Sequence, residues 1–324
     1  MSVAGTNTVT VVIPTHKRPE MLRALLDSLS RQRTSRRFEV VVVDDGSGGD
    51  LGALEVEFSD ITLKVIRLPH SRGRAFARNE GVRRSVGGTL IFVDDDMTVV
   101  EEFVEAHVAA HTGDDVVAIG DVLTAPEHRR DPLARYVEQQ GVRRLRNKAE
   151  IPPKCVRTGN LSMSRAMFGK IGMFDEAIAR YGEDMDLGMK LYYGGARFVF
   201  AERAISYHHH PPDIDDVIAK MEEYGRYTVP LLVAQHPEIA RVIRVHVTQP
   251  IRWFRDRPAV LAQKVAFRIG MTPPVYGLAR WLYRRQWLGD LLFPVIDYLR
   301  AYTYIRAYAE TSRDRGAQGD KRRT

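Results

Sequence analysis

The sequence predicts an α/β protein in which a Rossmann-like, mostly parallel sheet carries helices on both faces and is followed by a helical C-terminal extension. Two observations predict the sheet: short β-branched runs alternate with helical segments, and three of these runs end in polar residues. Alternating strands and helices are typical of parallel sheets with right-handed crossovers. A third observation predicts the extension, because beyond residue 213 aromatic and basic residues recur in helical patterns.

Each element follows from its own residues. The strands are expected where apolar, β-branched runs occur between turn residues. The first helix has Pro19 in its first turn, where the missing N–H costs nothing, and its leucines recur at helical spacing. The expected strands cover residues 8–13, closed by Pro14, then 38–43, 63–68, 89–93, 197–201 and 204–207; the expected helices begin at Pro19 and cover 75–85.

Polar residues follow three of these strands. They are Pro14-Thr15, Asp44-Asp45 and the run Asp94 to Asp96. In open parallel sheets, ligands bind beyond the carboxyl ends of the strands. The three polar segments are therefore expected to meet in one crevice.

The run Asp94, Asp95, Asp96 is the most informative of the three. It follows an apolar segment that is typical of a strand buried on both faces. Adjacent carboxylates repel and raise one another's pKa unless a cation neutralises them, which favours a divalent metal such as Mg²⁺ or Mn²⁺. An acidic loop after an edge strand is the alternative interpretation.

Composition excludes several classes of protein. The 324 residues are 44% hydrophobic and 27% charged, which is ordinary globular usage. Cys155 is the only cysteine, so no disulfide can form within the chain and a reducing, cytoplasmic setting is favoured. No signal-peptide pattern and no run of about 18 apolar residues occurs, so neither export by that route nor a membrane span is expected. The glycine-rich fingerprints of NAD enzymes and P-loop NTPases are also missing.

Positive charge is concentrated in the last quarter of the chain. Residues 241–324 contain 17 Lys and Arg against 6 Asp and Glu, whereas the whole chain has a net charge of +7. This asymmetry indicates an anionic partner for the C-terminal segment, either a membrane surface or an acidic substrate. No nucleic-acid-binding motif accompanies it, so nucleic acid is not an expected partner.

Seven short motifs occur in series between residues 8 and 210. They are VVIPT at 11–15, VVVDDGS at 41–47, Gly73 with ARN at 77–79, FVDDD at 92–96, GN at 159–160, GMFDE at 172–176 and GEDMDL at 182–187. In this order and spacing they resemble family 2 glycosyltransferases of the GT-A fold.

The resemblance implies transfer of a sugar from a nucleotide-sugar donor with inversion, usually with Mg²⁺ or Mn²⁺, and a UDP-sugar is the expected donor. It implies a GT-A domain over 1–212, with a nucleotide-sugar half at about 1–97 and an acceptor half at about 98–212. A helical extension over 213–310 and a disordered tail over 311–324 would follow.

The same resemblance assigns donor-binding residues. Pro14, Thr15 and Asp45 would hold the nucleobase, with Asp45 accepting a hydrogen bond from a base N–H, while Asp44 either contacts the donor or caps the turn at Gly46-Ser47. Arg78 would pair with the negative charge of the donor, with a helix-surface salt bridge as the rival interpretation.

Metal ligands are also implied. Asp94 would reach the ribose or the metal, and Asp96 would bind the metal on the diphosphate. Asp95 is grouped with Asp94 among the donor-binding residues, where it is either a third metal ligand or solvated. His208, just after the last expected strand, is the expected late ligand, and His210 is the second choice because alternation along a strand points both the same way.

The segment Glu183-Asp184 would supply the base. Inverting transfer needs a carboxylate that takes the proton of the acceptor hydroxyl, and the resemblance assigns this role to Asp184. The alternative is an acidic helix N-terminus, where negative charge is favourable. For Glu183 and for Asp186, three roles remain open: acceptor binding, donor-sugar contact and helix capping. Gly159 and Asn160 would shape the sugar and acceptor pocket, although packing roles are equally open.

The extension has two interpretations. Aromatic and basic residues on amphipathic helices suit an anionic membrane interface, and the same residues suit a homodimer contact. We therefore expect a cytoplasmic glycosyltransferase, peripheral at the inner face of the cell membrane, that acts on a cell-envelope or lipid-linked glycan. The competing class is a non-catalytic nucleotide-sugar-binding or scaffold protein with the same fold.

Overall fold

The computed structural model describes residues 8–49, 51–148, 150–178, 181–209, 213–253 and 255–320. The chain forms two compact units. The first, here called the sheet unit, comprises Met1–Arg130, Val137–Ala179 and Glu183–Pro211; the second, the helical unit, comprises Asp131–Tyr136, Arg180–Gly182 and Pro212–Thr324. The sequence analysis divided the chain after residue 212 and did not anticipate that 131–136 and 180–182 group with the helical unit.

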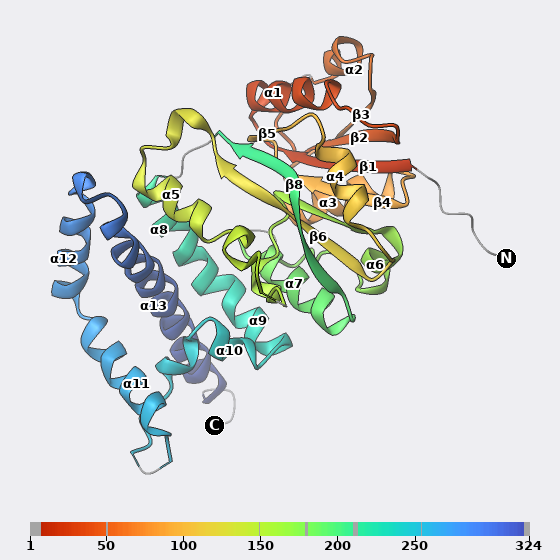
Figure 1. Ribbon diagram of the computed structural model, residues 1–324. Helices are drawn as coiled ribbons and strands as arrows, with labels where there is room; N and C mark the ends of the chain where they lie inside the picture. Colours follow the sequence, from red (N-terminus) through yellow and green to blue (C-terminus); the bar gives the residue numbers. More distant parts are fainter. Residues whose placement is uncertain are drawn as a thin grey trace. The chain divides into compact units, whose positions relative to one another are not determined.

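The sheet unit is built on an eight-stranded sheet with the order β3-β2-β1-β4-β7-β6-β8-β5 (Figure 1). Strands β1 to β4 pair in parallel, as expected. The sheet as a whole is mixed, because β7 is antiparallel to both of its neighbours and β5 is antiparallel to β8. The strands are β1 (Thr8–Thr15), β2 (Arg37–Asp44), β3 (Thr62–Arg67), β4 (Thr89–Val93), β5 (Met97–Val99), β6 (Val116–Thr124), β7 (Asn160–Ser164) and β8 (Arg197–His208).

Helices cover both faces of this sheet. Because side chains alternate along a strand, Val11 of β1 packs in a core with α1, α2 and α4, whereas Val12 packs in a second core with α3, α6 and α7. The helices of this part of the chain are α1 (Pro19–Ser30), α2 (Ala53–Glu57), α3 (Arg74–Arg83), α4 (Phe103–Ala110), α5 (Pro132–Gln139), α6 (Arg165–Lys170) and α7 (Glu183–Tyr193), with short η1 (Pro126–His128), η2 (Val142–Leu145) and η3 (Pro153–Cys155).

Two strand boundaries differ from expectation. Strand β1 continues through Thr15 instead of ending before Pro14, which is buried and pairs with Val43. The two strands expected at 197–201 and 204–207 are one strand, β8. Its pairing with β6 passes from Gly120–Ala201 to Asp121–Ile205, so a bulge absorbs the extra residues and the strand continues to His208.

The helical unit is organised around α13. This helix packs against α8, the π-helix η4 and α12, over a core of Leu133, Tyr136, Ile214, Ala279, Leu292, Ile296 and Leu299. Helix α13 reaches Asp320, so 311–320 is helical where the sequence analysis expected a disordered tail; residues 321–324 lie outside the described chain. The elements are α8 (Ile214–Glu223), η4 (Tyr224–Thr228), α9 (Val229–Gln235), α10 (Ile239–Val242), η5 (Val245–Thr248), α11 (Pro258–Gly270), α12 (Pro273–Tyr283), η6 (Gln286–Leu292) and α13 (Phe293–Asp320).

None of the helices in the described residues combines the length and the apolar character needed to cross a bilayer.

Candidate active site

The expected convergence of strand ends occurs in the sheet unit. Strand β1 ends at Thr15, and β4 ends just before the Asp94 to Asp96 run. The Thr15 hydroxyl donates a hydrogen bond of 2.7 Å to Asp95 Oδ2. Asp95 is 6% exposed, so its expected solvated position is wrong. Burial raises the pKa of Asp95 to about 6, and the neighbouring charge of Asp96 adds to the shift.

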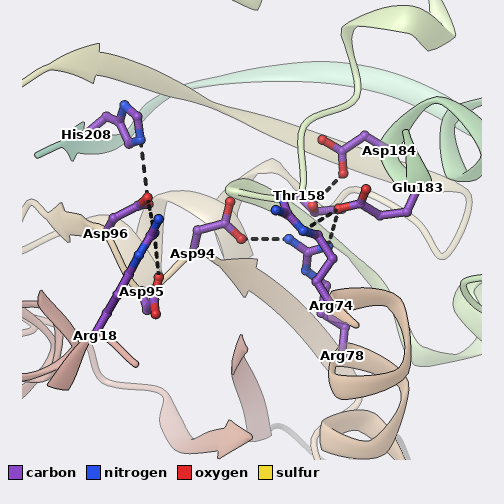
Figure 2. Close-up of polar contacts among 10 residues, drawn as sticks. All are labelled: Arg18, Arg74, Arg78, Asp94, Asp95, Asp96, Thr158, Glu183, Asp184 and His208. Carbon is purple, nitrogen blue, oxygen red and sulfur yellow. Dashed lines mark hydrogen bonds and ion pairs between the residues drawn. The ribbon is translucent and has the colours of Figure 1, made fainter. Parts of the chain in front are cut away.

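Asp96 contacts two basic side chains (Figure 2). Arg18 Nη1 lies 2.7 Å from Asp96 Oδ2 and 3.4 Å from Asp95 Oδ1. His208 Nε2 lies 3.5 Å from the same Asp96 oxygen. The antiparallel pairing of β5 with β8 explains the position of His208, which lies opposite Met97.

Arg18, like Thr158, which bonds to Asp184, is a site residue that the sequence did not predict. It directly precedes Pro19 of α1. The segment between β1 and α1 leaves the carboxyl end of β1, the same sheet edge at which the aspartates lie. A basic residue in this segment was therefore a signal for an ion pair with the Asp94 to Asp96 run.

Asp96 and His208 fit a divalent cation. Carboxylate oxygen and imidazole nitrogen are both ligands of such ions. Within the described parts of the chain, no three His, Cys, Asp or Glu side chains converge as a metal-binding group. Mg²⁺ is commonly held by one or two protein ligands together with substrate phosphates and water, so a pair is a sufficient protein contribution. His210, the second-choice ligand, lies outside the described residues.

Asp94 points away from this pair, toward α3 (Figure 2). Its Oδ1 accepts a hydrogen bond of 2.6 Å from Arg78 Nη2. The Nη1 of the same guanidinium donates to Glu183 Oε1 at 2.9 Å, and Arg74 Nε lies 3.6 Å from that oxygen. Arg78 therefore joins the carboxylate after β4 to the carboxylate at the start of α7.

Arg78 is only 1% exposed. Burial works against its charge, but the carboxylates of Asp94 and Glu183 outweigh this and raise its pKa. The helix-surface salt bridge is thus wrong, because the pair is internal and joins separate elements. Direct pairing with the donor stays a prediction; in this structure both Nη atoms bond to carboxylates.

Asp184 follows Glu183 at the start of α7. The Thr158 hydroxyl donates to Asp184 Oδ1 at 2.5 Å. Burial, reinforced by the adjacent charge of Glu183, raises the pKa of Asp184 to about 6. A carboxylate with a pKa in this range suits a general base near neutral pH.

Gly159 links the two carboxylate clusters. A Cβ atom at this position would lie 3.1 Å from Asp94 Oδ2. Its neighbour Thr158 bonds to Asp184. The chain therefore passes tightly between the Asp94 and Asp184 carboxylates, and a side chain at Gly159 would crowd the first of them.

Two expected pocket residues are internal. Asp186 is completely buried and forms an ion pair of 2.8 Å with Lys190. Asn160 is also completely buried, and its amide nitrogen donates to Ala204 O at 2.9 Å and to Ser206 Oγ at 3.0 Å. Both side chains support the framework, which favours the packing and capping roles left open for them, and their place in a sugar or acceptor pocket stays a prediction.

Asp45 anchors a loop. Its carboxylate accepts hydrogen bonds from the backbone N–H groups of Arg72, at 2.7 Å, and Gly73, at 3.0 Å, and from the Ser71 hydroxyl, at 2.7 Å. A carboxylate has about four acceptor positions, so one remains for a nucleobase N–H.

Asp44 caps the turn at Gly46-Ser47, one of its two expected roles. Its Oδ1 accepts a 3.0 Å hydrogen bond from the Ser47 N–H.

Comparisons with known proteins agree with this geometry. The family model described as Glycosyl transferase family 2 matches residues 10–172. The chain belongs to glycosyl transferase family 2. The identification from the motifs is confirmed, and with it the assignment of the chain to a family of enzymes.

Curated relatives carry related names. The chain is 27% identical over 266 residues to the uncharacterized glycosyltransferase YfnE of Bacillus subtilis, covering 65% of this chain and 68% of YfnE. It is 29% identical over 235 residues to the pre-mycofactocin glycosyltransferase of Mycobacterium tuberculosis, covering 71% of this chain. The match spans about half of that relative, 48% of its length.

Among solved structures, the mannosyltransferase PcManGT of Pyrobaculum calidifontis, in complex with GDP-Man and Mn²⁺, is similar in fold. The TM-score is 0.57 at 17% identity, over 92% of this chain and 88% of that one. At this identity the likeness concerns the fold alone. The expected GT-A fold is confirmed.

Proposed function

We propose that this chain is a metal-dependent, inverting glycosyltransferase that moves a sugar from a nucleotide-diphosphate sugar to a hydroxyl acceptor. One observation carries the proposal: Asp184, a carboxylate with a pKa of about 6, accepts a hydrogen bond from Thr158, and the next residue, Gly159, packs against Asp94 of the run after β4. Inverting transfer needs a base and a diphosphate site close together.

The roles of the residues follow from their contacts. Asp184 takes the proton of the acceptor hydroxyl, and Thr158 orients it by holding Oδ1, which leaves Oδ2 for the acceptor. Arg78 and Arg74 form ion pairs with Glu183, and the charge of Glu183 helps to raise the pKa of Asp184. Asp96 and His208 would hold the divalent cation. When bound, such a cation neutralises charge that develops on a leaving diphosphate.

The donor and acceptor are proposed by class only. A nucleotide sugar is supported by the GDP-Man complex of the similar mannosyltransferase, and the motif resemblance favours a UDP-sugar. For the acceptor we propose a cell-envelope or lipid-linked glycan. We further propose that the protein is cytoplasmic and peripheral at the inner face of the membrane. The concentration of positive charge in residues 241–324 supports this location.

A donor screen tests the proposal. The protein is incubated with UDP-, GDP- and dTDP-sugars, with Mn²⁺, Mg²⁺ or EDTA, and nucleotide release is measured. We expect nucleotide release from one donor in Mn²⁺ or Mg²⁺ and little release in EDTA. In D96A the activation barrier should rise by several kcal/mol. Nucleotide release in EDTA equal to that in Mn²⁺ or Mg²⁺ would contradict metal dependence. Donor binding without nucleotide release under every condition would favour the non-catalytic alternative.

A further inference from the structure

Helix α12 has an apolar face on each side. Its inner residues Tyr276 and Ala279 face α13, where the Tyr276 ring stacks on Tyr302 with centroids 4.4 Å apart. Its outer residues Val275, Leu278 and Trp281 are 37%, 55% and 50% exposed. Residues three apart lie on the same side of a helix, so these three form one stripe. A helix that packs on one neighbour needs a single apolar face, so the outer stripe is suited to a second partner.

The next element also exposes large apolar side chains. In η6, Trp287 is 81% exposed and Leu291 is 75% exposed. Figure 1 shows α12 on one side of α13 and α8 on the other, which agrees with the packing of both on α13. We call Val275, Leu278, Trp281, Trp287 and Leu291 the outer apolar set.

Positive charge accompanies the outer apolar set. Residues 251–292 contain eight Lys and Arg against two Asp. Both acids are already paired, Asp256 with Lys264 at 2.8 Å and Asp290 with Arg135 at 2.8 Å. In the described chain the side chains of six exposed arginines have no ion-pair partner: Arg252, Arg255, Arg257, Arg268, Arg284 and Arg285. Arg285 lies over the Trp281 ring, 4.7 Å from its centroid.

We propose that the outer apolar set, with the arginines around it, docks the helical unit on an anionic lipid surface. Tryptophan and leucine enter the boundary between headgroups and acyl chains, and arginines pair with lipid phosphates.

A second copy of the chain fits this face less well. Two copies that met through it would bring arginines against arginines, while both aspartates of the segment are already paired within the chain. Like charges facing each other in an interface are unfavourable. An anionic bilayer supplies the missing negative charge. Docking itself needs no catalysis; its consequence, that the enzyme meets a membrane-borne acceptor, rests on the proposed function.

Sedimentation with vesicles tests the proposal. The full chain is mixed with vesicles of phosphatidylcholine, or of phosphatidylcholine with phosphatidylglycerol. We expect binding only to the anionic vesicles, and loss of that binding in high salt, which screens the attraction. L278S/W281S removes apolar contact and R284Q/R285Q removes charge. Each should weaken the apparent Kd about tenfold or more, as expected for two interfacial residues.

Matched controls separate docking from general surface changes. V56S/Y192S exchanges two exposed apolar residues of the sheet unit, 79% and 55% exposed, and R37Q/R203Q removes two exposed arginines from the same unit. Both controls should bind vesicles like the wild type, and circular dichroism checks that every variant is folded. Equal binding by L278S/W281S and its control would overturn the proposal. Dimerisation of the wild type that L278S/W281S abolishes, without vesicle binding, would assign the face to a second copy.

Donor hydrolysis in the absence of acceptor and vesicles provides the independent readout. It should be unchanged in L278S/W281S, because these residues belong to the helical unit and not to the carboxylate site. Absence of vesicle binding by the wild type, with intact hydrolysis, refutes docking alone. Intact binding with no hydrolysis in any protein refutes the proposed function alone.

Discussion

The acids of the site form two clusters, each with its own arginine. Asp95 and Asp96 contact Arg18, whereas Asp94 and Glu183 of α7 contact Arg78. Both groups are close-set acids, but the cations differ in burial. The Arg18 side chain is 36% exposed in the segment before α1, and the Arg78 side chain is 1% exposed on α3. An exposed ion pair contributes little to stability, whereas breaking a buried pair leaves an uncompensated charge inside the protein.

The difference in burial distinguishes an arginine that can exchange with another cation from an arginine that is fixed in place. Arg18 can leave Asp96 toward solvent, and this would free an oxygen that a divalent cation needs. Arg78 is buried between its two carboxylates and has no such path to solvent. We infer that the first cluster is arranged for exchange with a donor-borne cation and the second for holding the base segment in place.

The largest effect is expected for the base. D184N keeps the shape of the side chain but removes the proton acceptor, so kcat should fall about 10²- to 10⁴-fold. Donor affinity, measured by calorimetry, should stay within about twofold because the donor aspartates are unchanged. Loss of donor affinity together with kcat would give Asp184 a donor-binding or capping role and move the search for the base to Glu183.

The next effect concerns stability and tests the comparison directly. R78M leaves Asp94 and Glu183 without their shared partner, and the free energy of unfolding should fall by about 3–5 kcal/mol. R18M, the matched control, should lower it by less than about 1 kcal/mol because its pair is partly solvated. Urea titrations measure both values. Equal losses in the two variants would mean that the two cations are not distinguished by burial.

A smaller, graded effect is expected from pH. Asp184 acts as a base only when ionised, and its raised pKa of about 6 predicts that kcat rises about tenfold per pH unit below pH 6 and then levels off. The folded state also holds this proton more tightly than the unfolded chain. The group therefore lowers the free energy of unfolding as pH rises from about 4 to 6.

Asp95 shares this pKa range, so a variant must separate the two. D95N should keep the rise in kcat, whereas D184N should lose it. A rise that disappears in D95N and persists in D184N would assign the titration to the aspartates after β4.

The smallest expected effect tests whether Arg18 exchanges with a metal ion at Asp96. R18Q removes the cation that competes for Asp96, so Mn²⁺ affinity without donor should increase up to about fivefold, the equivalent of about 1 kcal/mol. Calorimetry with Mn²⁺ alone measures it. The control is R23Q, which breaks the Arg23–Glu57 pair elsewhere on α1. Unchanged or weaker Mn²⁺ affinity in R18Q would show that Arg18 does not compete for the metal site.

The sequence predicted much of the framework and part of the site. Strands β1 to β4 and the first helix lie where their residue patterns predicted them, and Thr15 and Asp96 meet at the expected sheet edge. It did not distinguish Asp186 and Asn160 from pocket residues. Their burial depends on strands and helices that arrive from elsewhere in the chain.

The sequence by itself determined the first four strands, the first helix, the family and the set of carboxylates, because strand and helix patterns and motifs depend on residues near one another in the chain. Only the tertiary structure decided which cation serves which carboxylate. Arg18 is 78 residues from Asp96, and Arg78 is 105 residues from Glu183. With 48 Lys and Arg to choose from, no local pattern selects these partners. The selection follows from strand order and from the burial that makes one ion pair permanent and leaves the other open to exchange.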